Sequence, residues 1–164
     1  MQRHELDQEI HCSADRYWEL FLDDAFNVRM YEEGMGFPSC KIVSSREEGR
    51  VFHRTMTVIP TVDMPRALAK VVGDRVGFDE IAQFDRDKQV FTWRLVLAAF
   101  GDKVKITGKM HTVPHGEGRC RRLVSFEVEA KIFGIGGAVE KTAGQNSLDG
   151  WKKSATWFNQ NCAP

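Results

Sequence analysis

The chain has 164 residues, a length that fits one domain over residues 1–164 and leaves little room for two. Hydrophobic residues make up 42% and charged residues 28% of the sequence, an ordinary balance for a globular protein. Lysine plus arginine equals aspartate plus glutamate at 23 each. This zero net charge argues against a nucleic-acid binder, which usually shows a basic excess.

Cysteine spacing and apolar runs exclude two further classes. Cys12, Cys40, Cys120 and Cys162 lie singly, and none forms the C-x-x-C pair that would support a structural zinc site. The N-terminus lacks the apolar stretch of a signal peptide, and no run approaches the roughly 20 apolar residues of a membrane span. We therefore expect a cytoplasmic protein with free thiols and with neither a metal nor a cofactor.

The first third of the chain predicts a strand and two short helices. Residues 3–11 alternate polar and apolar positions, as a strand does. Ser13 is a good helix N-cap, and Tyr17 with the apolar residues around it forms the stripe of a short helix. A second short helix is expected over about 24–33, ended by Gly34.

From Pro38 to about 132 the hydrophobic period changes to two, which predicts strands. Residues 40–60 read as a hairpin that turns at Glu48 and Gly49, and a short helix or irregular crossing is expected near 64–73. Each of the five strands after this turn has one apolar face, so an antiparallel sheet with water on its outer side is predicted. The inward positions are Phe52, Arg54, Met56, Val58; Phe78, Glu80, Ala82, Phe84; Phe91, Trp93, Leu95, Leu97; Val104, Ile106, Gly108, Met110; and Val124, Phe126, Val128, Ala130.

The last segment, about 135–161, predicts a long amphipathic helix. Its apolar or small residues recur at steps of three or four. At ~1.5 Å per residue such a helix is roughly 40 Å long, enough to lie across a whole small sheet. The stripe consists of Ile135, Val139, Ala143, Ser147, Trp151, Ala155, Phe158 and Cys162.

This order of elements resembles the START-like or SRPBCC superfamily, the helix-grip proteins that include the birch pollen allergens and polyketide aromatase/cyclases. The matching stretches are IHCSADRYWELFLDDAF, RTMTVIP, VFTWRLVL, VKITGKMHTV and KIFGIGGAVEK. The resemblance is closest to a bacterial branch of uncharacterised function. It implies an α+β fold in which a curved antiparallel sheet of about seven strands wraps around the C-terminal helix. These motifs are topological rather than catalytic, so they specify fold well and chemistry poorly.

The resemblance also implies a cavity between sheet and helix that binds a hydrophobic small molecule or lipid. Large groups on the sheet wall facing small ones on the helix can leave such space, although the same pattern also fits a filled, interdigitating core. Asn146 could contact a ligand or simply cap a neighbouring loop. The expected apolar and small lining residues are Phe52, Met56, Phe78, Phe91, Trp93, Met110, Phe126, Val139, Ala143 and Ser147.

Arg54 and Glu80 are charged residues on otherwise apolar faces, where a charge is costly unless paired or wet. One interpretation is that Arg54 projects into the cavity and fixes a polar group of the ligand, with Glu80 orienting it. A bulge that turns either charge outward, or an internal structural ion pair, would also explain them.

Three functions remain open on sequence grounds. We expect first a non-enzymatic carrier or sensor, since no nucleophile, metal-ligand or catalytic histidine constellation occurs. A cyclase or hydratase-type enzyme that uses the same cavity is the second, with Arg54, Glu80 or Asn146 as its polar groups. The third is a protein-interaction module with a filled core. Apolar residues in the 60–72 loop could form a lid, a transient membrane contact or a dimer contact. Oligomeric state and ligand identity are not specified.

Overall fold

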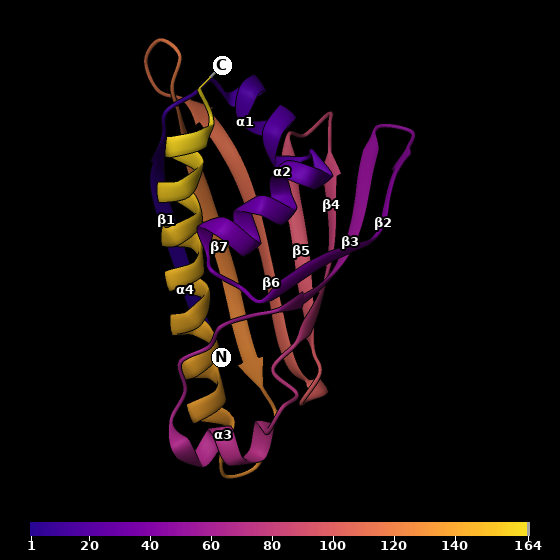
Figure 1. Ribbon diagram of the computed structural model, residues 1–164, viewed down its shortest axis with the longest axis vertical. Helices are drawn as coiled ribbons and strands as arrows, with labels where there is room; N and C mark the ends of the chain where they lie inside the picture. The colour runs from indigo at the N-terminus through magenta and orange to yellow at the C-terminus, as the bar shows by residue number, and fades with distance from the viewer. Residues whose placement is uncertain (164) are drawn as a thin grey trace.

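A computed structural model describes residues 1–163 of the chain, and its elements follow the predicted order (Figure 1). Only the last position of the expected domain, residue 164, lies outside the described residues. The elements are β1 (Gln2–Ile10), α1 (Ala14–Phe21), α2 (Asp24–Arg29), a turn of π-helix η1 (Met30–Gly34), β2 (Ser39–Glu48), β3 (Val51–Ile59), α3 (Arg66–Val72), β4 (Phe78–Asp85), β5 (Val90–Leu97), β6 (Gly101–Pro114), β7 (Cys120–Ala130) and α4 (Gly136–Asn161).

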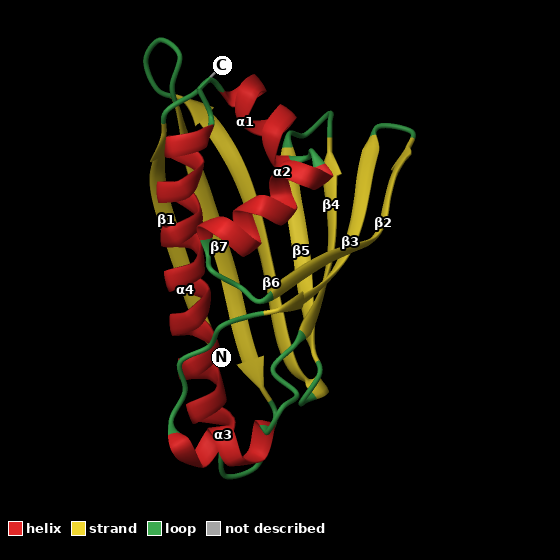
Figure 2. Cartoon of the chain, viewed as in Figure 1, coloured by secondary structure: helices red, strands yellow, loops and turns green. Residues whose placement is uncertain are grey.

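The seven strands form one antiparallel sheet in the order β1-β7-β6-β5-β4-β3-β2. Strands β2 to β7 pair with their neighbours in sequence, whereas β1 crosses to the far edge and pairs with β7 along its whole length. Figure 2 shows the helices gathered on one face of this curved sheet, with α4 lying along its β1 and β7 side. The predicted helix-grip α+β fold is therefore confirmed.

The N-terminal helices begin where their capping residues predict. Ser13 Oγ accepts a hydrogen bond from the Arg16 backbone N–H, and Asp23 caps α2 in the same way. The expected second helix is present but continues into η1, which ends at Gly34. A Cβ at Gly34 would lie 2.8 Å from Trp157 Cγ, so this glycine lets α4 pack closely against η1.

Two further glycines shape the interior. A Cβ on Gly108 of β6 would lie only 2.2 Å from the ring of Trp93, so the indole lies flat over a strand position that has no side chain. At the corner from β7 into α4, Gly134 has φ +81°, a backbone conformation that favours glycine. Gly134 therefore permits the sharp corner between the last strand and the long helix.

The half of the interior beneath α1 and α2 is densely packed. Tyr17 stacks on Phe21 and Phe158 with ring centroids 5.4 and 4.7 Å away, and Trp18 stacks on Phe84 at 4.3 Å. These side chains join a single core cluster of buried apolar residues. The four cysteines are buried and free, as expected. Close aromatic packing fills the interior of this half.

Candidate functional site

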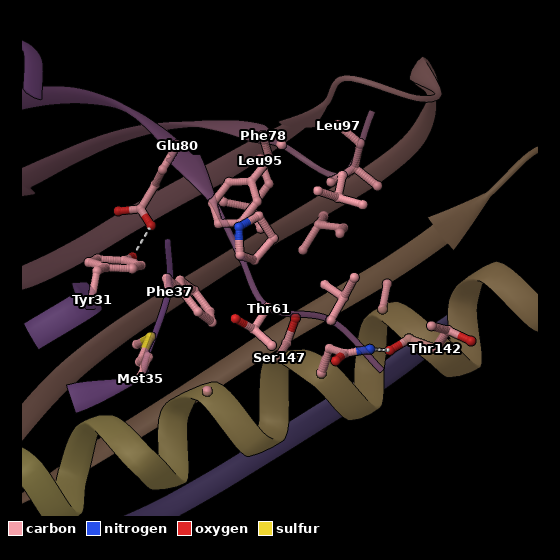
Figure 3. Close-up of a pocket in the computed structure, with 18 of the residues that line it drawn as sticks. Tyr31, Met35, Phe37, Thr61, Phe78, Glu80, Leu95, Leu97, Thr142 and Ser147 are labelled. Carbon is pink, nitrogen blue, oxygen red and sulfur yellow. Dashed lines mark hydrogen bonds between the residues drawn. The ribbon is translucent and has the colours of Figure 1, made fainter. Parts of the chain in front are cut away.

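A cavity of about 180 Å³ lies in the other half of the interior. Its walls are the inner face of the sheet, one side of α4, and the segment from Pro60 to Gly77 that contains α3. In Figure 3 the lining side chains run from Glu80 and Tyr31 at one end, along α4, to Leu97 and Thr142 at the other. The lining therefore draws on elements from across the chain.

The size of the cavity limits what it holds in this conformation. Sites for drug-sized ligands usually measure roughly 300–1,000 Å³, whereas an apolar cavity of roughly 150 Å³ is enough for benzene. The present space of about 180 Å³ thus accommodates a molecule the size of one aromatic ring with a short substituent. A sterol- or lipid-sized ligand would require the covering segment to move.

The segment from Pro60 to Gly77 covers the cavity, and side-chain hydrogen bonds of Asn146 and Thr61 hold it to the rest of the protein. Asn146 of α4 accepts a hydrogen bond from the backbone N–H of Asp63 at 3.0 Å and donates one to its carbonyl at 2.8 Å. Thr61 donates to the Gly36 carbonyl at 3.1 Å. Asn146 therefore lines the cavity, but its side-chain amide is hydrogen-bonded to the backbone of Asp63. This is the loop-capping role, one of the two roles considered for Asn146 from the sequence.

Glu80 and Tyr31 are the polar pair at one end of the cavity. The Tyr31 hydroxyl donates a 2.6 Å hydrogen bond to Oε2 of Glu80, and both residues are buried. Burial raises the pKa of the Glu80 carboxyl, although Tyr31 and Arg54 oppose this shift. Burial, reinforced by the neighbouring carboxyl, holds the pKa of Tyr31 well above its usual value, so the phenol stays protonated.

Of the thirteen residues expected to contact a ligand, nine line the cavity. They come from three strands and from α4, and whether they bind a ligand stays a prediction. These nine are Phe78, Glu80, Phe91, Trp93, Phe126, Val139, Ala143, Asn146 and Ser147. The alternation of period two and the helical stripe thus brought together residues far apart in the chain.

The other four expected residues, Phe52, Arg54, Met56 and Met110, do not line the cavity. Phe52 and Met56 lie on β3 beside Arg54, and Met110 accepts a hydrogen bond from the Tyr17 hydroxyl in the packed half. All four face inward as predicted, but the helices α1 and α2 cover this part of the sheet. The inward face of a strand residue, which is what the sequence predicts, therefore does not tell whether that residue lies in the packed half or lines the cavity.

Arg54 differs most from its expected role. Its guanidinium donates to the Phe21 carbonyl at 3.1 Å and lies 3.5 Å from Asp24 Oδ1. The Phe21 and Phe52 rings flank it, with centroids 5.8 and 5.5 Å from its Cζ. The structure thus places Arg54 in an internal ion pair that joins the start of α2 to the sheet, and not in the cavity.

A second buried arginine, Arg122 of β7, was missed. Its guanidinium donates to Gln8 Oε1, the Trp151 carbonyl and Ser154 Oγ at 2.6–3.0 Å, and more weakly to the Tyr17 hydroxyl at 3.3 Å. It also lies 4.8 Å from the Trp151 ring, which lines the cavity. Arg122 lies on the same inward face of β7 as the core residues Val124 and Phe126. The alternation along the strand that identified Arg54 could therefore have identified Arg122 as well.

Residues 1–163 contain no group of three or more histidines, cysteines, aspartates or glutamates placed to hold a metal ion. Among the helices of this described part, none is long and apolar enough to cross a membrane.

Comparison with known proteins gives a family and a fold. A family model described as "Protein of unknown function (DUF2505)" matches residues 5–160. A search of curated proteins found no match. The Zhui aromatase/cyclase from Streptomyces sp. R1128 superimposes with a TM-score of 0.67 at 13% identity, over 99% of this chain and 96% of that one.

Two further solved structures have the same architecture. A START superfamily protein from Mycobacterium smegmatis has a TM-score of 0.64 at 19% identity, covering 96% of this chain and 97% of its own. Norcoclaurine synthase from Thalictrum flavum has a TM-score of 0.63 at 16% identity, covering 98% and 87%. At these identities the likeness establishes the START/SRPBCC fold, as the sequence predicted. Any binding or catalytic role has to be argued from the residues of the cavity.

Proposed function

The chain belongs to the DUF2505 family of proteins of unknown function, and we propose that it binds a small hydrophobic molecule in the cavity beside α4. The observation that carries this proposal is the cavity itself. Its walls are mostly apolar side chains around a space of about 180 Å³. Burying an apolar ligand against these walls removes apolar surface from water, which is favourable, so the cavity supports a carrier or sensor over an interaction module with a filled core.

The nine predicted residues that line the cavity form the proposed binding surface. Aromatic side chains of the sheet supply apolar contact area, while Ala143 and Ser147 keep the α4 wall low. Two exposed apolar residues lie at the covering segment: Val71 within it, on α3, and Ile59 just before it. We propose that a lipid or other large ligand enters as this segment opens, and that the cover touches a membrane transiently when it does.

We extend the same proposal to the cellular setting. The whole chain, residues 1–164, would act as one domain in the cytoplasm, with no nucleic-acid partner and no cofactor. Support comes from the balanced charge of the sequence and from the single core cluster of the fold.

A second candidate function, a cyclase-type enzyme, is favoured by one observation. Glu80 is a buried carboxyl with a raised pKa in a cavity wall, the kind of group that serves as a general acid or base. One of the structural neighbours is an aromatase/cyclase and another is a synthase. Product formation from a cyclisable substrate that is lost in Glu80→Gln would favour the enzyme over the carrier.

Native mass spectrometry of freshly purified protein, followed by solvent extraction, tests the binding proposal. We expect a stoichiometric apolar adduct, or saturable binding of ethylbenzene in titration calorimetry. Ala143→Phe should weaken either by about tenfold or more because its ring occupies the cavity. Gln145→Phe is the matched control, since residue 145 is exposed on the same helix. Equal binding by parent and Ala143→Phe would contradict the proposed site.

A further inference from the structure

The carboxyl of Glu80 has an unused acceptor. Oε2 receives the Tyr31 hydroxyl, whereas Oε1 has no hydrogen-bond partner within residues 1–163. The residue is only 7% exposed and lines the cavity. A buried carboxyl normally needs donors for both oxygens, because burial without them costs free energy. The protein supplies one donor, so the second position is open to a molecule in the cavity.

Neighbouring groups do not meet this need. Arg54 directs two of its N–H groups to the Phe21 carbonyl and to Asp24, and its Nε–H, which has no partner within residues 1–163, does not reach Glu80 either. Arg75 also lines the cavity, and its guanidinium donates to the Val71 carbonyl. Cys40 on β2 also faces Glu80, but burial raises the pKa of its thiol to about 12, so the group is neutral. Its sulfur lies 3.9 Å from Met56 Sδ. Tyr31 is the remaining titratable group that faces Glu80, and its proton is already donated to Oε2.

Aromatic rings surround this end of the cavity. The Phe37 ring centroid lies 5.9 Å from that of Tyr31, and both rings line the space, as Phe78 does (Figure 3). The negative faces of such rings attract cations, and the attraction grows when water is excluded. A positive group beside Glu80 would therefore meet a carboxylate and aromatic faces together.

We propose that Oε1 of Glu80 is the polar anchor of the ligand, and that the cavity takes single-ring-sized apolar molecules bearing a hydrogen-bond donor, foremost a protonated amine. This inference rests on the proposed binding function and deepens it. We expect the affinity to be second highest for a neutral molecule with a hydroxyl donor and third for a purely apolar molecule. It should be lowest for a carboxylate, whose negative charge would lie beside that of Glu80. The volume of about 180 Å³ sets the one-ring limit.

The proposal predicts a coupling between ligand binding and pH. Burial raises the pKa of the Glu80 carboxyl, so this group keeps its proton to higher pH than an exposed glutamate does. An amine cation binds the ionised form, so its affinity should rise with pH as Glu80 ionises. Burial raises the pKa of Tyr31 and that of Cys40, so both stay neutral as Glu80 ionises, and Glu80 is the facing group that titrates. Ethylbenzene affinity should stay constant.

Titration calorimetry with four probes of one size tests the inference: 2-phenylethylamine, 2-phenylethanol, ethylbenzene and phenylacetate. The parent protein should bind them in that order. Glu80→Gln keeps an acceptor for Tyr31 but loses the charge, so amine affinity should fall by about tenfold or more. The side-chain amide introduced by Glu80→Gln also has N–H donors. The variant should therefore gain affinity for a fifth compound, acetophenone, whose carbonyl only accepts hydrogen bonds. Glu32→Gln removes a nearby charge outside the cavity and should leave all four affinities unchanged.

Each outcome decides between the inference and the function on which it rests. If ethylbenzene binds and the amine binds no more tightly, the anchor is wrong while the cavity remains a binding site. If none of the probes binds the parent, both proposals fail. Undiminished amine affinity in Glu80→Gln also overturns the anchor. Should Glu80→Gln fail to fold, the probe order and the pH profile of the parent decide alone.

Discussion

Arg122 and Glu80 are both charged residues on the inner face of the same sheet, yet their surroundings differ sharply. Arg122 is fully buried and donates to four separate acceptors from β1, α1 and α4. Glu80 receives one hydrogen bond, from Tyr31, and lines the cavity. Arg122, with all its partners, holds elements together, whereas one oxygen of Glu80 is without a partner among the described residues. The number of partners, more than burial, thus distinguishes Arg122 from the anchor that we propose.

The largest expected effect comes from removing the charge of Arg122. Arg122→Met would leave several buried acceptors without a donor, and we expect a loss of about 3 kcal/mol or more in the free energy of unfolding. Urea denaturation measures it. Arg121→Met is the neighbouring control: Arg121 forms a surface ion pair with Asp7, so its loss should lower the free energy of unfolding far less. Equal losses would remove the distinction drawn here.

A double-mutant cycle at Glu80 comes next. Glu80→Leu alone leaves the Tyr31 hydroxyl buried without an acceptor, and Tyr31→Phe alone leaves the carboxyl without a donor, so each should cost about 1–3 kcal/mol. Because the double variant removes both polar groups, it should lie within about 1 kcal/mol of the parent. Additive losses in urea unfolding would show that other contacts stabilise the pair.

A smaller effect is expected from trimming one acceptor of Arg122. Ser154 Oγ accepts from Arg122 at 3.0 Å and donates to the Trp151 carbonyl at 2.8 Å, so Ser154→Ala should cost about 1 kcal/mol. Thr156→Ala is matched to it, since Thr156 also donates to a carbonyl of α4 but is exposed. Thermal unfolding of the two variants should rank Ser154→Ala lower. The reverse ranking would mean that the network tolerates the loss of a member.

The smallest expected effect is a pH dependence of stability. The folded pKa of Glu80 lies above the unfolded value of 4.5, so the folded state holds its proton longer. The stability linked to this group is full below that value and is lost as pH rises through the raised pKa. Glu80→Gln should therefore gain stability relative to the parent as pH rises, which urea unfolding at several pH values checks. A constant difference would mean that the Glu80 pKa is unshifted.

The faces of the sheet could be predicted from the sequence, because side chains alternate strictly along a strand. Glu80 and Arg54 were both recognised as inward charges in this way. Which one reaches the cavity depends on which element covers that part of the sheet. Tyr31 was missed as the partner of Glu80 because it lies on η1, whose π-turn departs from the helical period of 3.6. The contact of Asn146 with Asp63 joins residues 83 positions apart and has no local signal.

The strand order has a consequence for how the chain is made. β1 is synthesised before the other six strands, yet its hydrogen-bond partner β7 is the last of the seven to leave the ribosome. The hairpins from β2 to β7 can form between neighbours as they emerge, but Gln2–Ile10 must wait with its backbone unpaired. The α4 helix that packs on β1 emerges later still. Sheet edge and helix are thus completed together, and the walls of the cavity are complete only once α4 has emerged.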